Sequence, residues 1–190
     1  MIVNVAGETN RDRKIWHTYV FWARSAFNSH PPPVGLTIAD PRNRLSLQQS
    51  QALQAILFTA FALEYRIRRY FDVLHLSYRK RDTLGSLIQH FAPRVQAAKR
   101  LDNGQPIRLP TSWQRLERKL LDLNHVRNQV AHAKYAEIDK LLGARPARIA
   151  ARGFNALIDF VRIVNAATGY DTEPPAVARR RYAPLKVPLR

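Results

Sequence analysis

Residues 52–63 read Ala-Leu-Gln-Ala-Ile-Leu-Phe-Thr-Ala-Phe-Ala-Leu, and this stretch decides the fold. Only Gln54 and Thr59 interrupt its apolar character, so a helix built from it is apolar on nearly every side. Such a helix is normally buried all round. The stretch is too short to cross a bilayer, which needs about 20 apolar residues. It therefore predicts the central helix of a bundle, extending from an N-cap at Ser46 to about residue 77.

The segments on both sides of this central helix also show helical periodicity. Residues 11–27 form an amphipathic pattern that ends at the prolines of positions 31–33. Residues 83–100 predict a helix with a kink at Pro93, and Thr111 with Gln114 forms a capping box for a helix over residues 111–134. A last helix is expected over residues 147–167, after Gly143 and Pro146. No segment alternates like a strand, so the fold class is all-α, a bundle of four or five helices.

The apolar faces of the first and last helices can be read from the same periodicity. In the first, one side carries Ile15, Tyr19, Trp22 and Phe27. In the last, the apolar face is expected to consist of Ile149, Phe154, Leu157, Ile158 and Val161. An apolar stripe at helical spacing is expected to turn toward a core.

The chain is predicted to contain one domain, residues 1–170, followed by a basic tail rich in proline and arginine, residues 171–190. A chain of 190 residues is long enough for one domain with a large hydrophobic core, but too short for two such domains. The tail contains Arg179, Arg180 and Arg181 and has no apolar periodicity, so we expect no packed element in it. Both an arm on nucleic acid and a solvated end fit this composition.

Charge and cysteine content indicate the environment and the partners. Lysine and arginine number 31 against 14 acids, a formal net charge of +17. Such an excess favours polyanions, above all the phosphate backbone of nucleic acids. There is no cysteine, which excludes disulfides and thiolate metal ligands. With no secretory signal at the N-terminus, we expect a cytoplasmic protein without a membrane segment, a metal or another cofactor.

The helix over residues 111–134 contains the best candidates for chemistry. Leu116, Leu120, Leu123 and Val130 fall on one stripe at about 100° per residue, and Arg127 lies near its middle. A guanidinium on an apolar face is costly unless it is paired. Glu64 is the one acid between Arg44 and Phe71, so we expect it to face Arg127 in an ion pair, direct or bridged by water.

Three polar side chains, those of His125, Asn128 and His132, fall on the opposite side of the same helix. Arg127 and His132 are five residues apart and therefore about 140° apart on an ideal helix. One regular helix does not bring these two side chains together. A site that uses both needs a distortion near Ala131 or a second copy of the helix, which is a physical reason to expect a dimer.

The run Arg127-Asn128-Gln129-Val130-Ala131-His132 resembles the Arg-x4-6-His motif of HEPN domains (higher eukaryotes and prokaryotes nucleotide-binding), in its form Arg-Asn-x-x-Ala-His. The order of helices, with a long second helix that carries an acid, is similar too. The resemblance implies a helical bundle that dimerises and joins two copies of the motif in one cleft. Many members are metal-independent ribonucleases of toxin–antitoxin, abortive-infection or antiviral systems.

The resemblance also implies roles for the residues of the run. His132 would be the general acid or base when a ribose 2′-hydroxyl attacks the adjacent phosphate, which leaves 2′,3′-cyclic phosphate ends. Arg127 would hold the phosphate and stabilise its developing charge. Asn128 would orient the phosphate or the imidazole, while His125 would be a neighbour rather than a second catalyst. The implied partners are RNA, a second copy of the chain and an antitoxin protein.

The sequence leaves other interpretations of the motif open. Toxins paired with a nucleotidyltransferase antitoxin often carry Arg-x4-His-x-Tyr, but here two residues, Ala133 and Lys134, separate His132 from Tyr135. The chain therefore departs from that subgroup. A non-catalytic module that binds RNA or a protein partner is the alternative to an enzyme. In the purely structural alternative, Arg127 is the buried partner of Glu64, and His132 is a surface or capping residue.

Overall fold

The computed structural model describes residues 10–28, 47–132, 140–143, 145–170 and 183–186. Its helices are α1 (Asn10–Asn28), α2 (Leu47–Val73), α3 (Leu84–Gln89), α4 (Phe91–Gln96), α5 (Trp113–His132) and α7 (Pro146–Thr168). Within these ranges there is no strand, and the one isolated β-bridge joins Lys99 to Pro106. The predicted all-α bundle is therefore confirmed. The expected N-cap, Ser46, lies outside the described residues.

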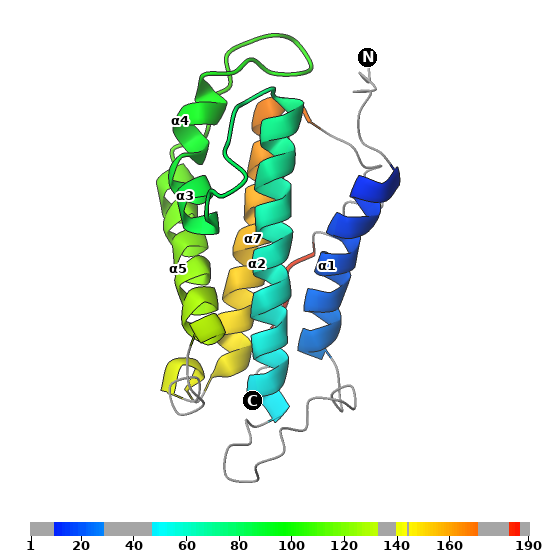
Figure 1. The fold of residues 1–190 in the computed structure, drawn as a ribbon, viewed down its shortest axis with the longest axis vertical. Helices are drawn as coiled ribbons and strands as arrows, with labels where there is room; N and C mark the ends of the chain where they lie inside the picture. Colours follow the sequence, from blue (N-terminus) through cyan, green and yellow to red (C-terminus); the bar gives the residue numbers. More distant parts are fainter. Residues whose placement is uncertain (1–9, 29–46, 133–139, 144, 171–182, 187–190) are drawn as a thin grey trace.

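Helix α2 is the centre of the bundle, as its apolar sequence predicts. It packs against α1, α3, α5 and α7, and Figure 1 shows it standing between α1 on one side and α3, α4 and α5 on the other. Ala55, Leu63 and Ile67 are completely buried. No helix in the described part of the chain has both the length and the apolar character needed to cross a membrane.

Helix α2 ends at Val73, four residues before the predicted end. His75 adopts the left-handed conformation, with φ 53°, and the Leu76 amide donates to the Phe71 carbonyl at 2.8 Å. This hydrogen bond satisfies a carbonyl that the helix end would otherwise leave unpaired. The chain therefore turns away from the helix axis at His75 and begins the connection to α3.

The segment predicted as one helix over residues 83–100 forms two short helices instead. Thr83 caps α3, since its side chain accepts from the Ser86 amide, and His90 separates α3 from α4. A proline ring clashes with the carbonyl four residues earlier, so the break falls before Pro93 rather than at it. Pro93 then lies in the first turn of α4, where no amide hydrogen is needed.

Aromatic rings join these short helices to the rest of the core. The Phe91 ring stacks on Phe71 of α2 at a centroid distance of 5.6 Å and on Trp113 of α5 at 5.4 Å. It also meets Phe160 of α7 edge to face at 5.0 Å. Phe91 of α4 therefore contacts rings of three other helices, and this cluster keeps the beginning of α5 beside α2 and α7.

The buried face of α1 differs from the predicted one. Trp16, Val20, Ala23 and Ala26 are buried, whereas Trp22 is 45% exposed. The two alanines are small enough for α1 to pack closely on its neighbours, so the larger rings lie at the edge of the contact. Trp22 rests against Phe58 of α2 at a centroid distance of 5.1 Å. Placing Trp22 on the core face was therefore wrong. The face predicted for α7 is confirmed apart from Ile149, which is half-buried.

One cation of α2 belongs to the interior. Arg66 is only 2% exposed, and its guanidinium lies over the rings of Trp16, Tyr70 and Tyr170 at 5.4, 5.0 and 5.3 Å from their centroids. A guanidinium stacks well on aromatic faces and is more weakly hydrated than an ammonium group, which favours arginine at such a position. Arg66 therefore contributes to packing rather than to the charged surface.

Part of the predicted tail is packed. Leu185 is buried, and its backbone exchanges two hydrogen bonds with the Asn155 side chain of α7, at 2.8 and 3.1 Å. Arg24 of α1 donates to the Ala183 carbonyl. Expecting no packed element after residue 170 was therefore wrong for residues 183–186. Arg179, Arg180 and Arg181 lie outside the described residues.

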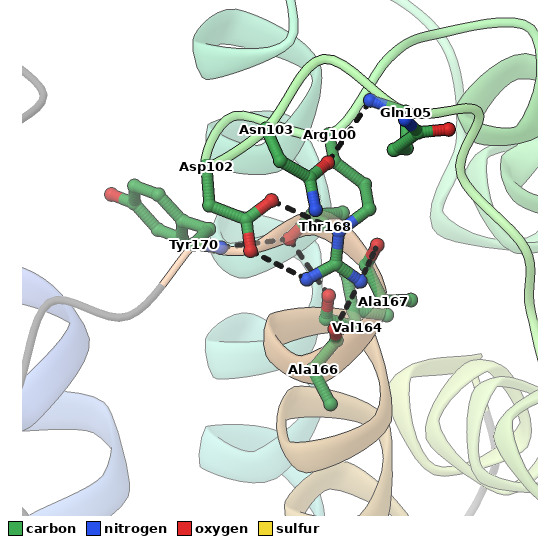
Figure 2. A network of polar contacts seen from close by, with 9 residues as sticks. All are labelled: Arg100, Asp102, Asn103, Gln105, Val164, Ala166, Ala167, Thr168 and Tyr170. Carbon is green, nitrogen blue, oxygen red and sulfur yellow. Dashed lines mark hydrogen bonds and ion pairs between the residues drawn. The ribbon is translucent and has the colours of Figure 1, made fainter. Parts of the chain in front are cut away.

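The C-terminal end of α7 is held by the loop that follows α4 (Figure 2). Arg100 donates to the carbonyls of Ala166 and Ala167 at 2.9 and 3.1 Å, and to both carboxylate oxygens of Asp102 at 2.9 and 2.6 Å. A cation satisfies the last carbonyls of a helix and stabilises its negative end. The hydrogen bond from Arg100 also lowers the pKa of the Asp102 carboxyl. Gly169, with φ 71°, ends the helix next to this pair.

Candidate nucleic-acid interface

The run Arg127 to His132 forms the last turns of α5. Leu116, Leu120, Leu123 and Val130 are buried, which confirms the predicted core stripe of this helix. Arg127 shares that stripe but lies near the end of the helix, where it is only half-buried. Its Nη1 donates to Asn128 Oδ1 at 2.8 Å, on the exposed side of the helix. The amide thus holds one edge of the guanidinium.

The predicted ion pair between Arg127 and Glu64 is not formed. Within the described residues, Glu64 pairs with Arg68, one turn further along α2, at 2.8 Å between Oε1 and Nη2. Arg68 reaches this carboxylate along its own helix, so no contact between helices is needed. Arg127 meets the amide of Asn128 instead of an acid. The structural alternative that makes Arg127 the buried partner of Glu64 is therefore wrong in its direct form.

The outward side of α5 carries the polar residues that were predicted there. His125 and Asn128 are both exposed. The backbone of His132 ends the helix, but its side chain lies outside the described residues, as do Ala133, Lys134 and Tyr135. The structure therefore brings Arg127 and Asn128 together and does not place the imidazole of His132.

Helix α7 packs very closely against α5 on one side. A Cβ atom added to Gly153 would lie 2.8 Å from Leu123 Cδ1, so only glycine allows this approach without a shift. One residue before, Arg152 forms an ion pair with Asp122 at 3.0 Å. The two helices run in opposite directions (Figure 1), which places the beginning of α7 beside the end of α5.

This packing adds an exposed stripe of arginines to the site. Arg148 and Arg152 are exposed and four residues apart, so they share one side of α7, and the exposed Arg145 is the N-cap residue before its first turn. Each turn back from Arg152 matches one turn forward from Asp122 in an antiparallel pair, which brings Arg148 level with Val126. Among the described residues, Arg145 and Arg148 have no acidic partner within 4.0 Å. Two guanidinium groups without an acidic partner therefore belong to the beginning of α7, which lies beside the end of α5.

The arginine stripe was missed in the reading of the sequence, although its signal is present there. Two cations four residues apart on a predicted amphipathic helix, Arg148 and Arg152, mark one charged face, and Arg145 stands just before that helix. What the spacing does not reveal is the neighbour of that face, because this depends on Gly153 meeting Leu123. In the described ranges, no group of three His, Asp or Glu side chains is arranged to hold a metal ion. Among the described side chains, the candidate surface is thus built from arginines, the Asn128 amide and the His125 imidazole.

In comparisons with protein-family models, curated proteins and solved structures, the chain shows no significant match.

Proposed function

We propose that this protein is a metal-independent endoribonuclease of the HEPN type that acts as a toxin or an antiviral defence effector. The observation that carries the proposal is that Arg127 is held in place by a neutral amide and not by a carboxylate. Arg127 is half-buried near the end of α5, its guanidinium is held by the Asn128 amide, and the beginning of α7, with its arginines, lies beside this end of α5. An arginine that is positioned but not neutralised is well suited to bind a phosphodiester.

The proposed reaction is an attack of the ribose 2′-oxygen on the neighbouring phosphorus. The 2′-hydroxyl loses its proton to a base, the bond from phosphorus to the 5′-oxygen breaks, and the leaving oxygen gains a proton. The products are a 2′,3′-cyclic phosphate and a 5′-hydroxyl. His132 transfers the proton because an imidazole titrates near neutral pH. Arg127 stabilises the charge that develops on the phosphorane.

Asn128 has a positioning role in this proposal. It binds Nη1 of Arg127, so the remaining donors of the guanidinium keep a defined direction. The 140° that separates Arg127 from His132 on an ideal helix favours a homodimer, in which the second copy completes the site. A cytoplasmic location and neutralisation by an antitoxin protein complete the proposal.

The test is RNA cleavage by the purified protein in the presence of EDTA. We expect cutting that leaves 2′,3′-cyclic phosphate ends, detected by the resistance of the 3′ ends to simple phosphatase treatment. His132→Ala and Arg127→Ala should each lower the rate about a hundredfold to ten-thousandfold. His125→Ala is the matched control, because His125 is exposed on the same helix one heptad earlier. It should leave the rate nearly unchanged.

The alternative function is a non-catalytic module that binds RNA or a protein partner. The exposed arginine stripe supports RNA binding without requiring any chemistry. The native protein would then retain RNA in a salt-dependent way and cut none of it. Cutting that survives both His132→Ala and Arg127→Ala would instead point to a contaminant or another site.

A further inference from the structure

The connection between α2 and α3 contains three consecutive cations, Arg79, Lys80 and Arg81, and all three are exposed. They belong to a tight turn. The Asp82 amide donates to the Arg79 carbonyl at 3.0 Å, and the Arg79 amide donates to Asp82 Oδ2 at 3.0 Å. Lys80 and Arg81 are therefore the two central residues of a turn that is closed from both ends.

Two arginines of the bundle tie this turn to the body of the protein. Arg68 of α2 donates to the Asp82 carbonyl at 2.9 Å. Arg94 of α4 donates to the Ser77 carbonyl at 3.3 Å and lies 3.9 Å from Asp82 Oδ2. The connection is thus attached to two different helices and cannot move as a free loop without breaking these contacts.

The residue before the cations is fixed as well. The Tyr78 hydroxyl donates to Asp72 Oδ1 at 3.0 Å, and its ring packs on Phe71 at a centroid distance of 5.8 Å. The guanidinium of Arg68 lies over the same ring at 5.4 Å. Burial and the bond to Asp72 raise the pKa of the Tyr78 hydroxyl, so it stays a neutral donor at physiological pH. The cations therefore project from a fixed base.

The charges around the turn do not cancel. Glu64 pairs with Arg68, and Asp82 lies beside Arg94, so these acids compensate the two arginines of the bundle. Among the described residues, the charged groups of the Arg79, Lys80 and Arg81 side chains have no carboxylate within 4.0 Å. The turn thus presents three uncompensated positive charges on a fixed backbone, so binding a polyanion there would order the side chains but not the loop.

We propose that the turn Arg79–Asp82 is a second RNA contact, which binds the phosphate backbone outside the site on α5. The identity of the polymer as RNA rests on the proposed function. A phosphate backbone fits better than a protein surface, because protein interfaces are anchored by exposed apolar rings. Such rings, Phe21, Trp22 and Phe61, belong to α1 and the middle of α2, and Tyr78 is packed on Phe71.

The first test measures the binding of a fluorescein-labelled 2′-O-methyl RNA, which cannot be cleaved because it lacks the attacking hydroxyl. Lys80→Ala with Arg81→Ala should raise Kd on the order of tenfold and lower the slope of log affinity against log salt by roughly 1.4. The control pair, Arg108→Ala with Lys186→Ala, removes the same charge from exposed positions elsewhere. If both pairs weaken binding equally, the turn is not a contact and the proposal fails.

The second test asks whether RNA affinity depends on the geometry of the turn or only on its net charge. Asp82→Ala makes the chain more positive, so a simple charge effect would tighten RNA binding. The structure predicts the opposite, a Kd raised about threefold, because the arginines and the lysine lose their fixed arrangement. A circular dichroism melt checks that the variant is folded. Tighter binding by the folded variant would overturn the proposal.

Cleavage assays keep this proposal distinct from the proposed function. A short RNA that binds at α5 without reaching the turn should be cleaved equally well by Lys80→Ala with Arg81→Ala, while cleavage of a long RNA should slow. If no RNA is cut but the binding results hold, the nuclease proposal fails and the second contact stands. Loss of affinity for phosphatidylserine vesicles with unchanged affinity for RNA would assign the turn to a membrane surface and overturn the proposal.

Discussion

Two glycines with the same backbone conformation have different surroundings. Gly104 has φ 70° and Gly169 has φ 71°, the left-handed region that favours glycine. Around Gly104 the space for a Cβ atom is open, whereas at Gly169 that atom would lie 2.5 Å from Asp102 Cγ. Asp102 is in turn bound to Arg100, which holds the end of α7. At Gly169 both the backbone conformation and the nearby Asp102 side chain oppose a Cβ atom, whereas at Gly104 only the backbone conformation does.

This difference predicts the outcome of a matched pair of substitutions. Gly104→Ala should lower the free energy of unfolding by about 1 kcal/mol, the cost of a left-handed residue with a Cβ atom. Gly169→Ala should cost at least twice as much, because it also displaces the Arg100–Asp102 pair. Urea unfolding at neutral pH measures both. Equal losses would mean that Asp102 moves aside without weakening the contact.

The ion pair of Glu64 with Arg68 predicts how much Glu64 contributes to stability. The pair with Arg68 is only partly buried, with side-chain exposures of 21% and 29%, and links neighbouring turns of one helix. Such pairs contribute between about 0 and 1 kcal/mol. Glu64→Ala should therefore lower the free energy of unfolding by no more than this amount. A loss of about 3–5 kcal/mol would indicate a buried partner after all.

A double-mutant cycle provides the control for this prediction. The coupling energy between Glu64 and Arg127 should be close to zero, since each residue binds a different group. The coupling between Glu64 and Arg68 should be a few tenths of a kcal/mol.

At the scale of elements, segments without periodicity still become part of the bundle. Residues 183–186 dock between α1 and α7, because Asn155 binds the backbone of Leu185 through both its donor and its acceptor. Leu185 is 7% exposed and belongs to the core cluster. The connection over residues 77–82 is likewise ordered by side chains of α2 and α4. In both segments, a few hydrogen bonds to side chains of the helices hold a backbone that is not itself helical.

The docked segment can be tested by comparing neighbouring positions. Leu185→Ala should lower the free energy of unfolding by about 2 kcal/mol, the lower end of the range for truncation of a buried leucine. Lys186→Ala should change it by less than about 0.5 kcal/mol, because Lys186 is exposed. Thermal and urea unfolding provide the measurement. If Leu185→Ala behaves like Lys186→Ala, the segment contributes nothing to stability in solution.

At the scale of the whole molecule, charge sets the conditions for assembly. Each copy has a formal net charge of +17, so two copies repel one another at low salt. Salt screens this repulsion, and it also weakens binding to RNA. The homodimer that we propose through the outward side of α5 should therefore respond to salt in the opposite direction from RNA binding.

We expect light scattering to give a mass near twice 21.9 kDa, with the dimer more stable at 0.5 M than at 0.05 M salt. His125→Arg adds like charges on the outward side of α5 and should shift the equilibrium toward the monomer. Arg108→Glu, on an exposed loop away from α5, is the control and should not favour the monomer. A mass of one chain at every concentration and salt would contradict the dimer.

Most of the helices, though not the break at His90, follow from the sequence because their signals are local. The apolar run in α2, the cap at Thr83, and Pro146 with Gly169 at the two ends of α7 act through residues a few positions apart. The core stripe of α5 follows from the same spacing. Half of the candidate site, Arg127 and Asn128 near the end of one helix, was therefore predictable.

Which residues from different helices meet follows only from the tertiary packing. Arg66 is surrounded by rings from α1, α2 and Tyr170, and Arg152 of α7 pairs with Asp122 of α5. Each of these contacts depends on how closely two helices approach and at what register. Helical spacing predicts on which side of its helix a residue lies, but not which other helix packs against that side. That partner is chosen when small residues such as Ala23 and Gly153 allow one particular packing to exclude the most water.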